Sequence, residues 1–177
     1  PPLPITADTV RQAPKVLLHD HLDGGLRPQT ILELADEHGY ANLPSSDPTE
    51  LAAWFRRGAE TKDILQYLAT FEHTCAVLQT EAALERVAAE AAVDLGADGV
   101  VYAEVRFAPE LHQDGGLALD AVVEAVQAGF RRGSAESGAA GHPIVVNTIV
   151  CAMRTARRSL EIAQLAVRHR ERDARIV

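Results

Sequence analysis

Three short apolar segments of β-forming residues, separated by helical patterns, constrain the fold of this chain more than any other feature of its sequence. They lie at residues 16–18, 99–109 and 143–153, and residues 174–177 resemble the start of a fourth. Strands that alternate with helices are typical of a parallel α/β sheet. The segment at 143–153 is apolar at nearly every position, as expected for a strand buried on both faces. We therefore predict a parallel α/β fold, either a closed barrel or an open doubly wound sheet.

The strand at 16–18 runs directly into two histidines, His19 and His21. Side chains at positions i and i+2 of a strand point the same way, so the two imidazoles can aim at one point while Leu18 and Leu22 pack on the other side. Two converging neutral imidazoles suit a zinc-type cation. A solvated turn is the alternative interpretation, because histidine, aspartate and glycine are common in loops.

The residues after the first strand favour a barrel over an open sheet. No Gly-x-Gly-x-x-Gly motif occurs there, which argues against a dinucleotide-binding fold, whereas ligands at the carboxyl end of a strand suit a βα barrel. A closed eight-stranded barrel takes about 250 residues, but this chain has 177. We therefore predict that residues 1–177 are the N-terminal portion of a single (β/α)8 TIM-type barrel, a partial barrel with about three strands and their helices.

Helical patterns fill the intervals between the predicted strands. The interval 47–98 contains three of them without a strand, which is long for a βα crossover, and we treat it as a helical insertion. Another pattern begins at Leu119 and continues through Phe130. Residues 133–141 are rich in glycine, serine and alanine, and this composition predicts a connection.

The strand at 99–109 carries two opposite charges, Glu104 and Arg106, on one face. An isolated buried charge is costly, so we expect the two side chains to pair with each other. We interpret them as a structural ion pair.

Charge and hydropathy exclude several classes of partner. A formal net charge of −8 argues against a nucleic-acid partner. The apolar runs fall well short of the about 18 residues that a membrane helix needs, and residues 1–4 lack the basic start and apolar centre of a signal peptide. The two cysteines, Cys75 and Cys151, are far apart in apolar contexts and indicate reduced packing residues. We expect no nucleic-acid or membrane partner and a cytoplasmic location.

Four blocks of sequence carry a resemblance to a known family. They read HDHLDGGLRP at 19–28, YLATF at 67–71, GVVYAEVRFAP at 99–109 and CAMR at 151–154. In this order and spacing they resemble the N-terminal half of the adenosine deaminase family of zinc amidohydrolases. The resemblance implies a βα barrel with one Zn²⁺, and hydrolytic deamination of adenosine and 2′-deoxyadenosine to inosine and ammonia in purine salvage.

The resemblance also implies roles for individual residues, with a purine nucleoside as the small-molecule partner. His19 and His21 match two zinc ligands, and Asp23 matches a residue that contacts the ribose; a turn carboxylate is the alternative for Asp23. Positions around the purine pocket match Tyr67, Phe71 and Met153, for which plain core packing is the alternative. The third histidine ligand, the metal-binding aspartate and the catalytic glutamate and histidine are expected beyond Val177.

Two further interpretations stay open from the sequence. One is a related amidohydrolase that acts on adenine, AMP or a modified adenosine. The other is a non-catalytic truncated paralogue that folds by pairing with another chain. Because two histidines are fewer than the three ligands of a catalytic zinc site, we expect the 177-residue chain alone to be inactive and to associate, either with the missing C-terminal half or with another chain.

Overall fold

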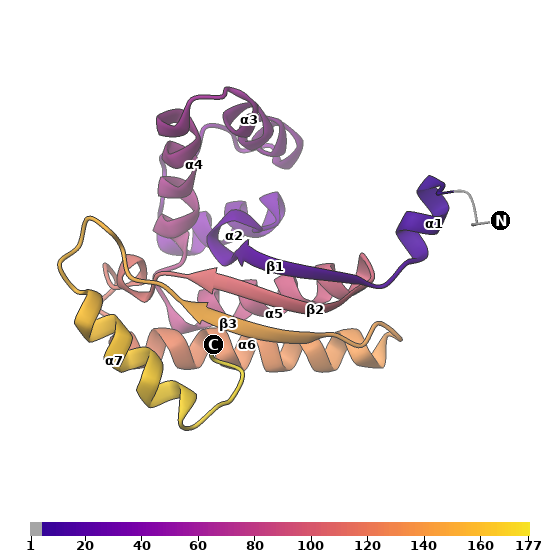
Figure 1. Cartoon of the computed structure of the whole chain (residues 1–177). Helices are drawn as coiled ribbons and strands as arrows, with labels where there is room; N and C mark the ends of the chain where they lie inside the picture. Colours follow the sequence, from indigo (N-terminus) through magenta and orange to yellow (C-terminus); the bar gives the residue numbers. More distant parts are fainter. Residues whose placement is uncertain (1–4) are drawn as a thin grey trace.

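The computed structural model describes residues 5–177; residues 1–4, which lack a signal-peptide pattern, lie outside the described part. Three strands, β1 (Lys15–His21), β2 (Val100–Phe107) and β3 (Val145–Val150), form one sheet in the order β1-β2-β3, and both pairings are parallel. Ile176 adds a parallel bridge to Thr148, where a fourth strand was predicted. The predicted parallel α/β fold is confirmed, and the carboxyl ends of the strands meet at one edge of the sheet (Figure 1).

Helices occupy the intervals between the strands, and capping residues explain where several of them begin and end. Asp47 accepts a hydrogen bond from the Glu50 backbone N–H at 2.8 Å, and Gly39 ends a helix with φ of 67°, a conformation that glycine adopts without strain. The helices are α1 (Ala7–Gln12), η1 (Leu22–Gly24), α2 (Pro28–His38), α3 (Pro48–Glu60), α4 (Ile64–Val77), α5 (Glu81–Ala97), η2 (Pro109–His112), α6 (Leu119–Ala139) and α7 (Ser159–Arg170). Among residues 5–177, no helix combines the length and apolar character that a membrane crossing requires.

Helices α5 and α6, which we call the core layer, lie side by side against one face of the sheet (Figure 1). Ala103, Val105 and Val146 of the sheet belong to the same buried cluster and are each at most 1% exposed. The helices contribute Leu84, Val87, Ala88, Ala92, Val122, Val123, Val126 and Phe130 to this cluster. The core layer therefore buries one face of β2 and β3, while Leu17 of β1 is only partly buried against it.

Helix α6 is longer than its sequence predicts, because it continues to Ala139 through residues where we predicted a connection. A Cβ atom at Gly129 would overlap the Glu85 carbonyl oxygen, and one at Gly133 would overlap the Ala89 carbonyl oxygen. The glycines therefore let the two helix backbones approach closely. Glycine costs a helix about 1 kcal/mol relative to alanine, and packing against α5 outweighs this local preference. The prediction for 133–139 is wrong for this reason.

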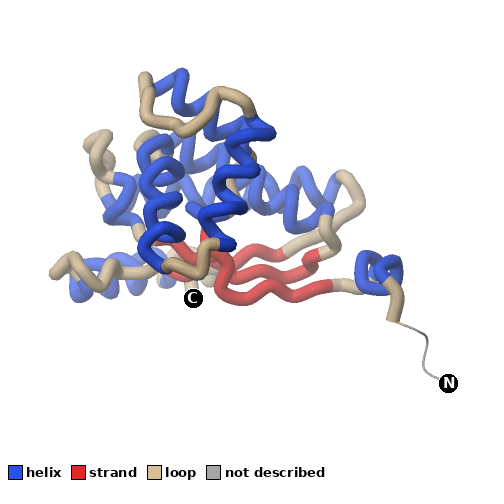
Figure 2. Tube along the Cα trace, turned by 90° about the horizontal axis from the view of Figure 1, so that it is seen from above, coloured by secondary structure: helices blue, strands red, loops and turns tan. Residues whose placement is uncertain are grey.

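Helices α3 and α4, which we call the helical cap, lie on the other side of the sheet from the core layer, near the carboxyl ends of the strands (Figure 1). Helix α4 contacts both η1 and η2, the turns that follow β1 and β2. Figure 2 shows α1 at the opposite end of the strands, apart from the other helices. The structure thus divides the predicted insertion at 47–98 into a cap over the strand ends and one helix, α5, of the core layer.

Candidate functional site

A cavity of about 530 Å³ opens at the carboxyl ends of the strands, beneath α4. Five of the six candidate residues line it, and they come from four separate parts of the chain: the end of β1, η1, α4 and the segment after β3. These residues are His21, Asp23, Tyr67, Phe71 and Met153. His19, the sixth, contacts Arg106, which also lines the cavity. The structure therefore brings together the residues that the sequence selected.

The end of β1 departs from a regular strand at His19. This residue has φ of 64°, and the register to β2 shifts between Leu17 and Asp20. Because of this irregularity, alternation does not decide the direction of the side chains, and the prediction that Leu18 packs opposite the histidines is wrong: its side chain is 60% exposed. Leu22, in contrast, is 1% exposed, as predicted.

The His19 and His21 rings lie close to each other, with centroids 5.7 Å apart and planes inclined by 64°. Two imidazoles that bind one zinc ion at about 2.0–2.1 Å have ring centres roughly 5–6 Å apart by the same geometry. The separation of the two rings therefore matches that of two ligands of a single ion. Among residues 5–177, no group of three or more histidine, cysteine, aspartate or glutamate side chains is arranged to hold a metal.

Neighbouring charges define which nitrogen of each histidine is available. His21 Nδ1 lies 3.6 Å from Asp23 Oδ1, and a carboxylate beside one ring nitrogen is typical of metal-binding histidines, because it orients the other nitrogen. Arg106 donates to His19 Nε2 at 2.8 Å. Since arginine can only donate, Nε2 is the acceptor and its lone pair is engaged by Arg106, so zinc binding at this nitrogen requires Arg106 to release it. The two imidazoles are thus of the right type for two ligands of a zinc site, but in this structure Arg106 occupies His19 Nε2.

Arg106 is a contact that the sequence interpretation missed. We predicted an ion pair between Arg106 and Glu104, but Glu104 instead accepts a hydrogen bond from the Tyr102 hydroxyl at 2.8 Å, and Arg106 contacts His19. The prediction is wrong because each side chain has another partner: Glu104 pairs with Tyr102 of the same strand, and Arg106 pairs with His19 of the neighbouring strand β1. Which residue of β1 lies beside Arg106 depends on the register of β1 on β2, so the sequence alone does not show the contact with His19.

Asp23 is the most deeply buried charged group of the cavity, with 10% of its side chain exposed. Burial raises the pKa of its carboxyl group above the ordinary value, while interactions with His21, the Asp23 backbone and Arg106 oppose this rise. Oδ2 lies 3.9 Å from the Cys75 sulfur, and Oδ1 has no hydrogen-bond partner among the described residues. Asp23 therefore lines the cavity with one carboxylate oxygen that is buried and has no hydrogen-bond partner among the described residues.

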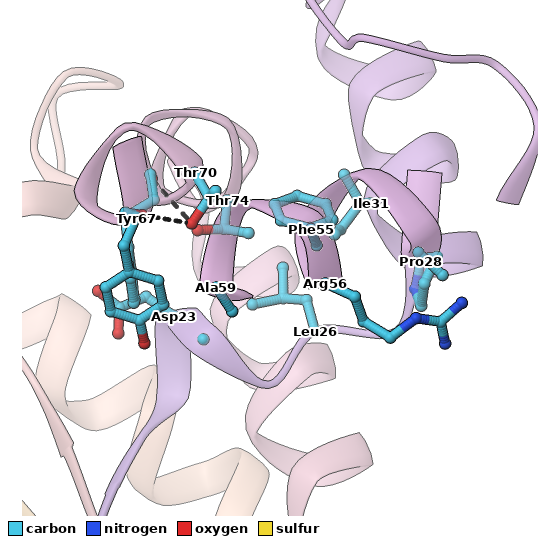
Figure 3. A pocket seen from close by; sticks show the side chains of 13 residues that line it. Asp23, Leu26, Pro28, Ile31, Phe55, Arg56, Ala59, Tyr67, Thr70 and Thr74 are labelled. Carbon is cyan, nitrogen blue, oxygen red and sulfur yellow. Dashed lines mark hydrogen bonds between the residues drawn. The ribbon is translucent and has the colours of Figure 1, made fainter. Parts of the chain in front are cut away.

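Aromatic side chains of α4 form the wall of the cavity next to the histidines. Tyr67 and Phe71, one turn apart, have ring centroids 5.3 Å apart, and Phe71 lies 6.0 Å from the His21 ring. A second cavity of about 330 Å³ lies behind them, toward α2 and α3, and shares Asp23, Tyr67 and Phe71 with the first. Figure 3 shows Asp23 and Tyr67 at one end of this second cavity and Arg56 at the other. The two aromatic rings and Asp23 therefore separate the two spaces.

Met153 lies in the segment after β3, and a contact with η2, the turn that follows β2, fixes this segment. The Met153 backbone N–H donates to a carboxylate oxygen of Glu110, which lies in η2. The other oxygen of Glu110 is buried. Glu110 is a second residue that the sequence interpretation missed, since nothing in the local pattern links it to a segment more than 40 residues away.

Similarity to known proteins identifies the family of this chain. The family profile described as adenosine deaminase matches residues 14–176, nearly the whole chain. The chain belongs to the adenosine deaminase family. An adenosine deaminase from Mycobacteroides abscessus is 62% identical over 166 residues, a match that covers 94% of this chain and 46% of that protein. The chain thus spans about half the length of the curated relatives it matches.

Solved structures of amidohydrolases share the fold. The crystal structure of an adenine deaminase from Arthrobacter aurescens superimposes with a TM-score of 0.68 at 28% identity, over 88% of this chain and 46% of that one. An amidohydrolase from Burkholderia ambifaria with bound zinc superimposes with a TM-score of 0.63 at 26% identity, over 84% of this chain and 39% of that one. This similarity confirms the predicted fold class, a (β/α)8 barrel. The chain supplies about the first three strands of such a barrel.

Proposed function

We propose that the intact protein, meaning this chain continued to the length of its family relatives, hydrolyses adenosine and 2′-deoxyadenosine to inosine or 2′-deoxyinosine and ammonia in purine salvage. The present chain is its N-terminal portion, residues 1–177 of a single metal-dependent barrel. One observation carries the proposal: His21, Asp23, Tyr67, Phe71 and Met153 converge on one cavity in a member of the adenosine deaminase family.

The residues of this chain act in binding and orientation. His19 and His21 would hold the zinc ion, and when bound, zinc supplies the Lewis acidity that makes water nucleophilic near neutral pH. Asp23 Oδ1 accepts a hydrogen bond from a ribose hydroxyl. It is buried and has no hydrogen-bond partner among the described residues, and an unpaired buried acceptor is costly. Tyr67, Phe71 and Met153 form the apolar wall for the purine and exclude water from it.

The remaining catalytic groups belong to the part of the protein beyond residue 177. Two histidines are fewer than the three protein ligands of a catalytic zinc site, so the 177-residue chain alone is inactive. Its sheet also exposes Val16 and Leu18, each 60% exposed, and open strand edges with apolar residues promote association. Deamination of adenosine by the purified 177-residue chain with equimolar zinc would contradict this part of the proposal.

Mutation of the histidines tests the site directly in the intact protein. We expect His19→Ala and His21→Ala to lose bound zinc and to lower kcat/KM for adenosine on the order of a thousandfold or more, because each removes a ligand of the metal that activates water. Zinc content is measured by atomic emission and deamination by the change in ultraviolet absorbance. His38→Ala, at the exposed end of α2, is the matched control and retains both. Full zinc content in either site variant would overturn the assignment.

Adenine is the alternative substrate with a specific observation behind it, namely the 28% identical structure of an adenine deaminase. Steady-state kinetics of the intact protein with adenosine, 2′-deoxyadenosine, adenine and AMP distinguish the candidates. We expect the highest kcat/KM with the two nucleosides, because Asp23 requires a ribose hydroxyl as its partner. A preference for adenine or AMP would reassign the substrate and leave the family unchanged.

The cytoplasmic location is also part of this proposal. Cys75 and Cys151 form no disulfide, which supports a reducing compartment. Fractionation of cells that express the intact protein tests it, and recovery outside the cytoplasmic fraction would contradict it.

A further inference from the structure

Cys75 lies next to Asp23 at the candidate substrate cavity. It follows Phe71 by one turn of α4 and lines the same cavity. Its sulfur lies 3.9 Å from Asp23 Oδ2, a long and weak hydrogen bond in which the thiol donates. The Asp23 side chain is nine-tenths buried, and its other oxygen, Oδ1, faces His21 Nδ1 at 3.6 Å. The second cysteine, Cys151, makes its corresponding long contact with the Ile149 carbonyl oxygen and does not line the cavity.

We propose that Cys75 is a positioning residue that holds Asp23 through Oδ2 and so directs Oδ1 toward the ribose hydroxyl of the substrate. This inference rests on the proposed function, since it assigns to Cys75 a part in the binding of a nucleoside. It goes beyond the sequence interpretation, in which Cys75 is only a packing residue.

The state of the thiol supports this role. Burial raises the pKa of Cys75 to about 12, with a further rise from the negative charge of Asp23, so the thiol keeps its proton at neutral pH and can donate it in a hydrogen bond. A thiolate at this place would instead repel the carboxylate. The two oxygens of Asp23 then have different surroundings. Oδ2 accepts the hydrogen bond from the thiol. Oδ1 lies 3.6 Å from His21 Nδ1 and has no hydrogen-bond partner among the described residues.

A double-mutant cycle in the intact protein tests the proposal. Cys75→Ala removes the hydrogen-bond donor, and Cys75→Ser keeps one. Asp23→Ala and the double variant Cys75→Ala with Asp23→Ala complete the cycle. Cys151→Ala is the control. Steady-state kinetics with adenosine give KM and kcat, and calorimetric titration with inosine gives Kd for the variants that turn over slowly. Thermal denaturation compares their folded states.

We expect Cys75→Ala to raise KM and the inosine Kd about three- to tenfold with kcat within about twofold of wild type, as the loss of one weak hydrogen bond to a charged group predicts. Cys75→Ser restores most of the affinity, Cys151→Ala changes neither constant, and Cys75→Ala has no further effect when Asp23 is already alanine, because the two residues act as one unit.

An unchanged KM in Cys75→Ala, an equal loss in Cys75→Ser, or an equal loss in the Asp23→Ala background would each overturn the inference and leave the proposed function intact. No adenosine turnover by the wild-type intact protein would overturn the proposed function, and the inference with it.

Discussion

The core layer and the helical cap flank the same sheet but differ in how they use their apolar residues. In the core layer, Leu84 of α5 and Val126 of α6 are both 0% exposed. In the cap, Ile64, Leu65 and Leu68 of α4 are 64%, 74% and 54% exposed. The same residue types therefore stabilise the fold on one side of the sheet and remain near water on the other side, where the candidate cavity opens.

The two regions also differ in how closely their helices pack. Gly133 of α6 faces the backbone of α5 at Ala89, whereas Gly58 of α3 faces only the methyl group of the Thr70 side chain in α4. A backbone carbonyl in a helix cannot move aside, but a side-chain methyl group can rotate. The comparison indicates that stability resides in the core layer and that the cap can adjust its side chains around a ligand at little cost to the fold.

Truncation of matched leucines gives the largest expected difference between the two regions. Leu84→Ala leaves a cavity in the core layer and destabilises the intact protein by about 2–5 kcal/mol. Leu65→Ala removes a side chain that is already 74% exposed, and its effect stays within about 0.5 kcal/mol. Equilibrium urea denaturation measures both free energies. Equal losses would contradict the division between the regions.

The buried His112 joins η2 to the end of α4 and makes stability depend on pH. Its Nδ1 lies 3.0 Å from the Leu78 carbonyl oxygen and donates to it, and Nε2 is buried without a hydrogen-bond partner among the described residues. Burial lowers the pKa of His112 from 6.5 to about 4. Between these values the unfolded chain binds more protons than the folded one, so stability rises with pH. The contribution of about 3 kcal/mol is complete above about pH 6.5 and is lost as the pH falls toward 4.

His112→Asn isolates this contribution, because asparagine keeps a donor for Leu78 but does not titrate. We expect the free energy of unfolding of the wild type to fall more steeply than that of the variant from pH 7 to pH 5, as measured by urea denaturation at each pH. Parallel pH profiles would show that His112 is not the group responsible.

Alanine substitution of three glycines gives smaller expected differences between the core layer and the cap. Gly133→Ala forces a Cβ into the Ala89 carbonyl oxygen and costs about 1–3 kcal/mol. Gly138→Ala, also in α6 but with no heavy atom of its surroundings within 4 Å of the added Cβ, stabilises the helix by about 0.5–1 kcal/mol. In the cap, Gly58→Ala displaces only the Thr70 methyl group. The cost of this displacement nearly cancels the gain in helix stability from replacing glycine by alanine. The free energies come from urea denaturation, and a cost at Gly58 as large as at Gly133 would contradict a more adaptable cap.

Much of the fold was predictable because it depends on local patterns. Apolar runs located the strands, and helical patterns located the helices in the intervals between them. The carboxyl ends of parallel strands share one edge of the sheet, so a strand that runs into His19 and His21 predicts a site there. The resemblance to a family then selected Asp23 and residues of α4, and the structure brings them to one cavity.

The parallel α/β class and the family could be recognised from the sequence alone, and it also proposed the residues of the candidate site, because short-range patterns and motifs carry this information. Only the tertiary structure decided the contacts between segments distant in the chain. The pairing of Arg106 with His19 depends on the irregular register of β1, and the contact of Cys75 with Asp23 depends on how α4 stands over the strand ends. The helical state of 133–139 depends on the surface of α5. Such contacts arise from packing between surfaces, which no local preference of either segment encodes.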